Sequence, residues 1–358
     1  MKKKLVGMLA TATLLTMALA GNVQAAEIRS VGPDGEAAVD ASTIELTDDQ
    51  IAQIKEGGYT AAICLHYGGN DWSTSQQKGL EDTFGELGIE IVAVTDANFS
   101  AETQVSNIET VMAKKPDILV SIPTDATATA DAYKQAAAAG IKIVFMDQRA
   151  NGLEAGKDYV SVVSADNYGN GYASGTVLGD ALGGKGKVAM VYYDANFAPT
   201  YQRDEGFRDA MKNYPDIEIV TEQGFTDESG CAEQGDAILT QFPNIDGIYA
   251  SWDVPMEGVL SAVRAAGMEG KVTLACNDLG NNVAREIASG NIAGGGAQMP
   301  YDQGVAEAKL AALALLGEET PSYVAVPAET VTHENVLEAY TDVYHVETPD
   351  WLKEAYVD

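Results

Sequence analysis

Short apolar runs alternate with longer amphipathic segments along most of this chain, and this alternation limits the folds open to it. The runs have the length of strands and stay apolar on both faces, which is typical of parallel sheets covered by helices on both sides. In the first half we expect strands at 61–65, 89–94, 118–122 and 141–146, with helices at 73–87, 101–114 and 126–139. Gly88 and Gly140 follow two of these helices and predict left-handed helix ends.

A second series of the same kind begins at residue 159. We expect its strands at 159–163, 188–192, 217–221, 247–250, 272–275 and 292–298, and its helices at 168–182, 201–213, 230–241, 255–266, 280–289 and 302–316. Two such series predict an α/β fold of two lobes, each a doubly wound parallel sheet. Residues 323–326 and 330–332 are interpreted as added strands, followed by a polar tail that contains aromatic residues.

The start of the chain has a different composition. A basic segment at 2–4, an apolar stretch at 5–20 and small residues up to Ala25 predict a secretory signal peptide at 1–25. A transmembrane anchor is the alternative, but it needs about 20 apolar residues, and this stretch is shorter and interrupted by threonines. Residues 26–57 are interpreted as a leader with a flexible start and one short helix capped by Thr47 and Gln50. No cysteine lies near the cleavage point, so we expect a soluble periplasmic protein without a lipid anchor.

Charge and cysteine content exclude several classes of function. Without residues 1–25 the chain has 19 Lys and Arg against 53 Asp and Glu, a net charge of −34 that disfavours nucleic acid and anionic membranes as partners. About 330 residues remain, enough for two lobes. Cys64, Cys231 and Cys276 allow at most one disulfide, and we expect buried free thiols. None of the three histidines has metal-ligand spacing to a cysteine, so neither a metal nor a cofactor is expected.

The loops that follow the expected strands are the candidate binding site, because ligands of open parallel sheets bind beyond the carboxyl ends of the strands. No loop carries a dinucleotide fingerprint or a P-loop. The loops carry amides, carboxylates, an arginine and aromatic rings instead: Asn70, Trp72, Asp147, Gln148, Arg203, Phe225, Trp252, Asp278 and Gln298. Hydroxyls donate and accept hydrogen bonds at once, which suits this polar set, and flat rings cover C–H faces. The set predicts a small sugar or polyol as ligand.

Each of these residues alone also fits a structural role. The two aspartates are possible helix caps, the two tryptophans possible core residues, Arg203 a possible partner of a surface acid, and Gln298 a possible ordinary strand end. The prediction therefore depends on their convergence at one edge of both sheets.

Seven short motifs between about residues 59 and 331 occur together in one known family. They are GNDW at 69–72, IPTD at 122–125, MDQ at 146–148, SADN at 164–167, RDEGF at 203–207, ND at 277–278 and QMPYDQG at 298–304. With them the chain resembles the periplasmic sugar-binding proteins of ABC importers, in particular the ribose-binding-like cluster of the type I periplasmic binding protein fold.

The resemblance implies a role for each candidate residue. Asn70 would touch a hydroxyl, Trp72 and Phe225 would form aromatic walls, Asp147 and Asp278 would accept from hydroxyls, Arg203 would donate, and Gln298 would lie beside a crossover. The chain departs from the ribose pattern at Ile122, Gln148 and Trp252, where ribose binders have asparagine, arginine and asparagine. These departures remove polar contacts. They favour a smaller or less oxygenated ligand, such as a short polyol, a deoxy sugar or a small pentose-like signal molecule.

The resemblance also implies a hinge of three crossovers, near Ala165-Asp166, Gln298-Met299 and Val326-Pro327. The lobes would then be 58–165 plus 299–326, and 166–298 plus 327–358, closing on the ligand. It implies a non-enzymatic monomer that passes its ligand to an ABC importer permease and its ATPase.

Three alternatives differ from this interpretation. The main partner could be a chemoreceptor or a sensor kinase, which the sequence does not separate from an importer. An exported glycosidase would use Asp147 and Asp278 as acid and base. The sensor domain of a transcription regulator shares the fold, but the signal peptide and the lack of a basic segment argue against it.

Overall fold

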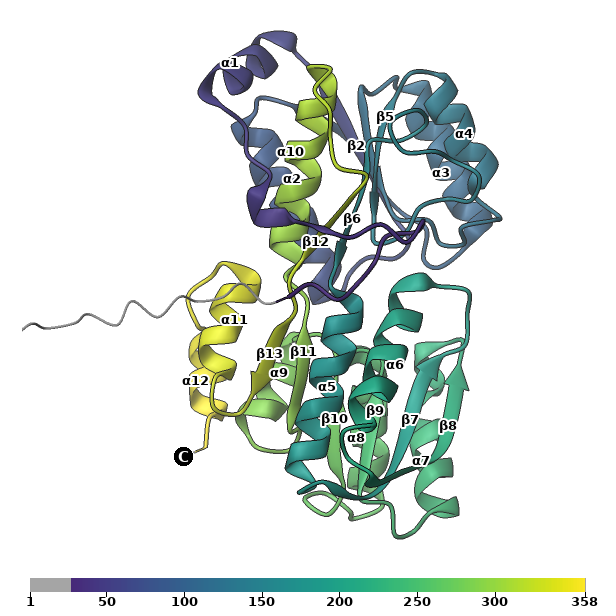
Figure 1. The fold of residues 1–358 in the computed structure, drawn as a ribbon, viewed down its shortest axis with the longest axis vertical. Helices are drawn as coiled ribbons and strands as arrows, with labels where there is room; N and C mark the ends of the chain where they lie inside the picture. Colours follow the sequence, from purple (N-terminus) through teal and green to yellow (C-terminus); the bar gives the residue numbers. More distant parts are fainter. Residues whose placement is uncertain (1–26, 358) are drawn as a thin grey trace, which may run out of the picture.

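The computed structural model describes residues 27–357, so the expected signal peptide lies outside the described residues. The described chain forms two lobes stacked along the long axis, each built on one sheet with helices on both faces (Figure 1). Every strand pair is parallel except one at the edge of the second sheet. The predicted fold of two doubly wound lobes is therefore confirmed.

The first lobe is built on a seven-stranded sheet. Its strands are β1 (Val39–Asp40), β2 (Thr60–Leu65), β3 (Glu90–Asp96), β4 (Ile118–Ser121), β5 (Lys142–Met146), β6 (Ser161–Ala165) and β12 (Tyr323–Val326), in the order β1-β12-β6-β5-β4-β2-β3. Its helices are α1 (Asp48–Gly57), α2 (Asp71–Glu86), α3 (Ala101–Ala113), α4 (Ala130–Ala138) and α10 (Pro300–Leu315), with a 3₁₀ turn η1 at Ala41–Thr43.

The second lobe is built on a six-stranded sheet. Its strands are β7 (Lys185–Tyr193), β8 (Asp216–Phe225), β9 (Gly247–Ala250), β10 (Thr273–Cys276), β11 (Gly294–Ala297) and β13 (Glu329–Thr332), in the order β13-β11-β10-β9-β7-β8. Its helices are α5 (Asn167–Ala181), α6 (Ala198–Met211), α7 (Cys231–Gln241), α8 (Asp253–Ala265), α9 (Asn281–Ala288), α11 (Val336–Tyr344) and α12 (Asp350–Ala355), with a 3₁₀ turn η2 at Glu228–Gly230.

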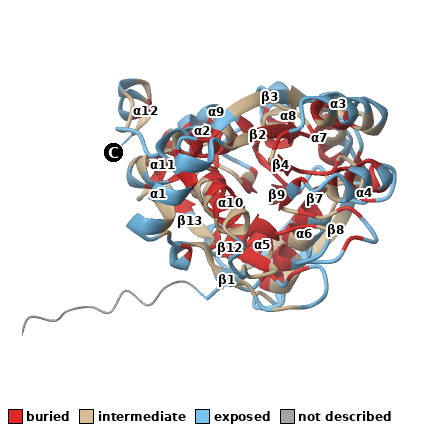
Figure 2. Cartoon of the chain, turned by 90° about the horizontal axis from the view of Figure 1, so that it is seen from above, coloured by how far each residue is buried: buried red, intermediate tan, exposed pale blue. Residues whose placement is uncertain are grey.

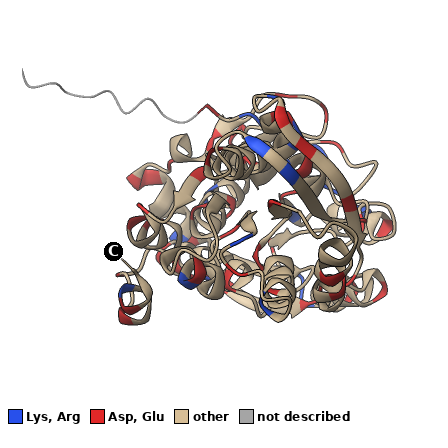
Figure 3. Cartoon of the chain, turned by 90° about the horizontal axis from the view of Figure 1, so that it is seen from below, with Lys and Arg blue, Asp and Glu red and all other residues tan. Residues whose placement is uncertain are grey.

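The apolar strands are buried on both faces, as the unbroken apolar runs require. In β2, Ala61 and Ile63 pack into the cluster under α2 and α10, whereas Ala62 and Cys64 pack into the cluster under α3 and α4. Figure 2 shows the same pattern for the molecule, with buried residues on the strands and inner helix faces and exposed ones on the outer helices. Acidic residues are spread around the surface (Figure 3).

The chain passes between the lobes three times. It leaves the first sheet after β6 to form α5 on β10 and β11, returns after β11 to form α10 on α2 and β5, and crosses again from β12 to β13. We propose to divide the lobes at these passages, as 58–165 plus 299–326 and 166–298 plus 327–358.

The leader contains the capping box expected for α1, in which Thr47 and Gln50 bond each other's backbone N–H. The prediction of a flexible segment before this helix is wrong. The Asp166 carboxylate accepts the backbone N–H groups of Arg29 and Ser30 at 2.9 and 2.8 Å, and β1 pairs with β12. The segment also reaches the core of the first lobe: Ile44 belongs to the cluster under α2 and α10, and Ile28 and Ala38 pack against the cluster under α3 and α4.

The polar tail expected at the end of the chain forms α11 and α12 instead. Val336, Ala339, Tyr340 and Val343 share one face of α11 and are buried in the core of the second lobe. Acidic residues between them hide this helical spacing in the sequence.

Gly88 and Gly140 have positive φ angles of 68° and 87°, as predicted for helix ends. All three cysteines are buried free thiols, which confirms the expectation. No helix between residues 27 and 357 combines the length and apolar character that crossing a membrane demands.

Candidate functional site

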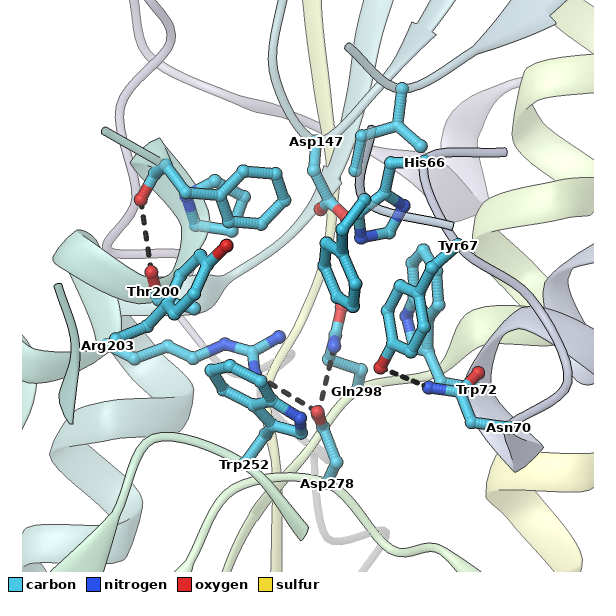
Figure 4. A pocket seen from close by; sticks show the side chains of 15 residues that line it. His66, Tyr67, Asn70, Trp72, Asp147, Thr200, Arg203, Trp252, Asp278 and Gln298 are labelled. Carbon is cyan, nitrogen blue, oxygen red and sulfur yellow. Dashed lines mark hydrogen bonds and ion pairs between the residues drawn. The ribbon is translucent and has the colours of Figure 1, made fainter. Parts of the chain in front are cut away.

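A cavity lies between the lobes at the carboxyl ends of the strands (Figure 4). Its empty volume is about 460 Å³. Fifteen residues line it: His66, Tyr67, Asn70, Trp72, Phe99, Ile122, Asp147, Tyr193, Phe197, Pro199, Thr200, Arg203, Trp252, Asp278 and Gln298.

Asp147 and Asp278 hold matching places in the two lobes. Asp147 follows β5 and donates its N–H to Val163 at 2.7 Å, while Asp278 lies two residues after β10 and donates its N–H to Gly296 at 2.8 Å. Both have left-handed backbones, with φ of 53° and 68°. This conformation costs a non-glycine residue on the order of 1–3 kcal/mol and is frequent at functional sites. Neither aspartate caps a helix: β5 is followed by β6 without a helix between them, and Gly280 is the N-cap of α9.

Arg203 projects from α6 and is 4% exposed. Its guanidinium donates to Asp278 at 3.0 Å, to the Asn167 side chain at 2.8 Å and to the carbonyl of Ser251 at 3.2 Å. Burial opposes its charge, but Asp278 and Asp147 outweigh that effect and raise the pKa of Arg203. The arginine is therefore a fixed positive charge on the cavity wall.

The two carboxylates are held differently. Oδ1 of Asp147 accepts from Ser164 at 2.9 Å and, at 3.4 Å, from Asn167 and Gln303, while no hydrogen bond among the described residues uses its Oδ2. Burial raises the pKa of Asp147, and Arg203 partly offsets this. Asp278 is engaged on both oxygens, by Arg203 and by Gln298 at 2.9 Å. The free oxygen of Asp147 is thus available to a donor in the cavity.

The rest of the lining is mostly aromatic. His66 stacks on Phe197 with 5.4 Å between ring centroids, and Tyr67 stacks on Phe99 at 4.1 Å. Figure 4 shows His66, Tyr67 and Trp72 on one side of the cavity and Arg203 and Thr200 on the other. Both lobes contribute rings to the cavity, since Tyr193, Phe197 and Trp252 belong to the same lobe as Arg203.

The structure brings seven of the nine predicted residues to the cavity: Asn70, Trp72, Asp147, Arg203, Trp252, Asp278 and Gln298. The two tryptophans also belong to the lobe cores, so their structural and lining roles coexist. The amide of Asn70 is occupied, because Oδ1 caps α2 and Nδ2 donates to the Tyr67 hydroxyl. Its contribution to the wall is to hold Tyr67.

Gln148 and Phe225 lie outside the cavity lining. The Gln148 amide donates to the carbonyl of Pro123 at 2.8 Å and accepts the N–H of Ala198, on the other lobe, at 3.1 Å. Phe225 packs behind the wall, with ring centroids 5.6 Å from Tyr193 and 5.1 Å from Trp252.

Sequence reasoning missed seven lining residues, five of them aromatic: His66, Tyr67, Phe99, Tyr193, Phe197, Pro199 and Thr200. The rule of reading strand ends contained the signal for three of them, since His66 and Tyr67 follow β2 and Tyr193 ends β7. Phe99 and Phe197 stand in loops, where no periodicity marks them.

The lobes are in contact across the cavity. The Asp71 carboxylate at the start of α2 accepts the N–H of Asn281 at 2.7 Å and its side-chain amide at 2.8 Å, at the start of α9. The bond from Ala198 to Gln148 and the stack of Phe197 on His66 join the lobes at other points. The described conformation is therefore the closed one.

The model of a family described as the periplasmic binding protein domain matches residues 61–319. The ribose import binding protein of Salmonella typhimurium is 24% identical over 272 residues, covering 76% of this chain and 90% of that protein. The D-ribose/D-allose-binding protein of Pseudomonas aeruginosa is 29% identical, covering 73% of this chain and 83% of that protein.

Solved structures agree with the fold. An ABC transporter solute-binding protein from Actinobacillus succinogenes, with bound D-allose, superposes with a TM-score of 0.72 at 29% identity, covering 78% of this chain and 99% of that chain. One from Agrobacterium vitis, bound with α-D-tagatopyranose, has a TM-score of 0.74 at 26% identity, covering 82% of this chain and 100% of that chain.

Proposed function

Since the chain belongs to the periplasmic binding protein domain family, we propose that it captures a small sugar or polyol between its lobes and delivers it to an ABC importer. The relatives named for ribose and allose binding support a sugar-like ligand, and their names support an importer as partner and the periplasm as location. The protein binds its ligand without changing it.

The main support for this proposal is that Arg203 lies between the carboxylates of Asp147 and Asp278. The two carboxylates come from different lobes, and the arginine between them donates from a buried position. A hydroxyl bonded here meets a charged acceptor and a charged donor at once. Such bonds contribute about 1.5–3 kcal/mol net each. Four or five of them, after the cost of immobilising the ligand, support micromolar or tighter affinity.

The dimensions and lining of the cavity favour a small ligand. The empty volume of about 460 Å³ lies in the lower half of the range that small-molecule sites usually span. Ile122 and Trp252 add apolar surface where the ribose pattern has asparagines. We therefore propose a short polyol, a deoxy sugar or a small pentose-like molecule. Nanomolar binding of ribose together with no binding of polyols or deoxy sugars would refute this choice.

A thermal-shift screen followed by calorimetry tests the function. We expect at least one pentose, deoxy sugar or short polyol to raise the melting temperature, because a ligand that binds only the folded state stabilises it. Asp278→Ala should weaken that ligand by a few kcal/mol, since its hydroxyls lose a charged partner. Asp209→Ala, at an exposed ion pair with Lys212, is the control. A screen without any binder, or unchanged affinity in Asp278→Ala, would contradict the proposal.

A further inference from the structure

Three buried polar atoms on the cavity lining have no hydrogen-bond partner among the described residues. They are Nδ1 of His66, Nε1 of Trp72 and Oε1 of Gln298. Buried polar atoms are almost always hydrogen-bonded, and leaving one unpaired costs about 1–3 kcal/mol. Since all three belong to residues that line one cavity, an occupant of that cavity is the natural partner.

His66 is the most constrained of the three residues. It follows β2, is 4% exposed, and its imidazole is enclosed by rings. Tyr67 and Trp72 meet it edge-on, with centroids at 4.8 and 5.7 Å, and Phe197 of the other lobe stacks on it at 5.4 Å. The enclosure is completed only when the lobes close, so the imidazole is placed by the same movement that encloses a ligand.

The charge state of His66 defines what it can bind. Burial lowers the pKa of His66 to about 3, so the imidazole is neutral at neutral pH. A neutral imidazole has one donor and one acceptor nitrogen, and a hydroxyl is the partner that matches either. Six further buried side-chain atoms are unpaired among the described residues, on Gln76, Thr95, Asn170, Gln303 and Glu307, but these residues do not line the cavity.

We propose that His66 is a specificity-determining residue that hydrogen-bonds one ligand hydroxyl and holds a carbon-rich edge of the ligand against Tyr67, Trp72 and Phe197. The inference rests on the proposed function. The ligand then has two unlike sides. One side carries the hydroxyls that meet Asp147, Arg203 and Asp278, and the other carries a single hydroxyl among C–H groups. A deoxy sugar has this distribution, because each missing hydroxyl leaves a C–H edge, whereas erythritol, xylitol and a fully hydroxylated hexose carry an oxygen on every carbon.

A comparison of His66→Phe with the unaltered protein tests the inference. The probes are D-ribose, 2-deoxy-D-ribose, L-fucose, erythritol and xylitol, measured by calorimetry, together with monodeoxy analogues of whichever probe binds most tightly. We expect His66→Phe to keep the ring packing and to weaken that probe about tenfold or more. One monodeoxy analogue should lose a similar factor in the unaltered protein and little more in His66→Phe, because both changes remove the same bond.

Two further variants keep the result interpretable. His333→Phe is the matched control, since His333 stacks on Tyr356 and is not part of the cavity lining. If His66→Phe fails to fold, His66→Gln replaces it, and it should retain discrimination among the monodeoxy analogues because its amide still bonds a hydroxyl. If no probe binds the unaltered protein, the proposed function fails. If a probe binds and both His66 variants match the unaltered protein in affinity and discrimination, only the role of His66 is overturned.

Discussion

The contact between Asp71 and Asn281 allows lobe closure to be separated from ligand contact. Its two hydrogen bonds, of 2.7 and 2.8 Å, join the start of α2 in the first lobe to the start of α9 in the second. Neither residue lines the cavity. Replacing Asp71 with alanine removes both bonds and leaves the cavity lining as it is.

The size of the effect follows from the type of contact. A hydrogen bond to a charged group contributes about 1.5–3 kcal/mol when buried, but these two are exposed and therefore screened by solvent. We assign about 1–2 kcal/mol to the pair, which corresponds to a factor of about 5–30. If the unliganded protein is mainly open, closure without this contact costs that much more, and Asp71→Ala raises Kd by the same factor.

Calorimetry and stopped-flow measurements with the ligand found by the screen provide the assay. The contact forms after the ligand has entered, so the dissociation rate should rise while the association rate stays near that of the unaltered protein. Asn282→Ala is the control, because that amide donates to Glu257 at 3.1 Å within the second lobe. A Kd within twofold of the unaltered protein for Asp71→Ala, with its fold intact, would refute the reasoning.

Three further predictions concern stability. Arg203→Met should lower the free energy of unfolding by about 3–5 kcal/mol in urea titrations, because two buried carboxylates lose their cation. Burial raises the pKa of Asp204 to about 7, above its value of about 4 in the unfolded chain. The protonated Asp204 therefore contributes stability that is fully present below about pH 4 and is lost as the pH rises through about 7. Asp204→Asn should flatten that part of the pH dependence, measured as unfolding free energy at pH 4.5 and 7.5; an unchanged slope would contradict the assignment. In Asp166→Ala the amides of Arg29 and Ser30 lose their acceptor and should exchange hydrogen about tenfold faster or more, as mass spectrometry would show.

Periodicity was sufficient to predict the fold because both sheets bury unbroken apolar strands. The strand 118–122 and the observed β4 (Ile118–Ser121) differ by one residue, and the predicted helix 230–241 coincides with α7 to within one residue. The ends of the chain were harder. β1 has two residues and is held by backbone pairing, which leaves no side-chain pattern, and α11 is a short helix that exposes Glu338 and Asp342 between its buried residues.

The polar part of the site was predictable for a similar reason. Parallel strands bring their carboxyl ends to one edge of the sheet. Asp147 and Asp278 closely follow such strand ends, so their place at the cavity depends little on the conformation of the rest of each loop. Both residues have left-handed backbones at these strand ends, a conformation that is frequent at functional sites.

The sequence shows that a residue at a strand end is polar, but it does not show which neighbouring group forms hydrogen bonds with that residue. Asn70, Gln148 and Trp72 illustrate the three outcomes. The amide of Asn70 is used within its own loop, that of Gln148 is used between the lobes, and Nε1 of Trp72 has no partner among the described residues. The unpaired Nε1 of Trp72 leaves a bond for a ligand, and so does the second N–H of the Asn70 amide, because only one of its two donors is used. Residue type alone therefore does not give the number of polar contacts that the first lobe offers to a ligand.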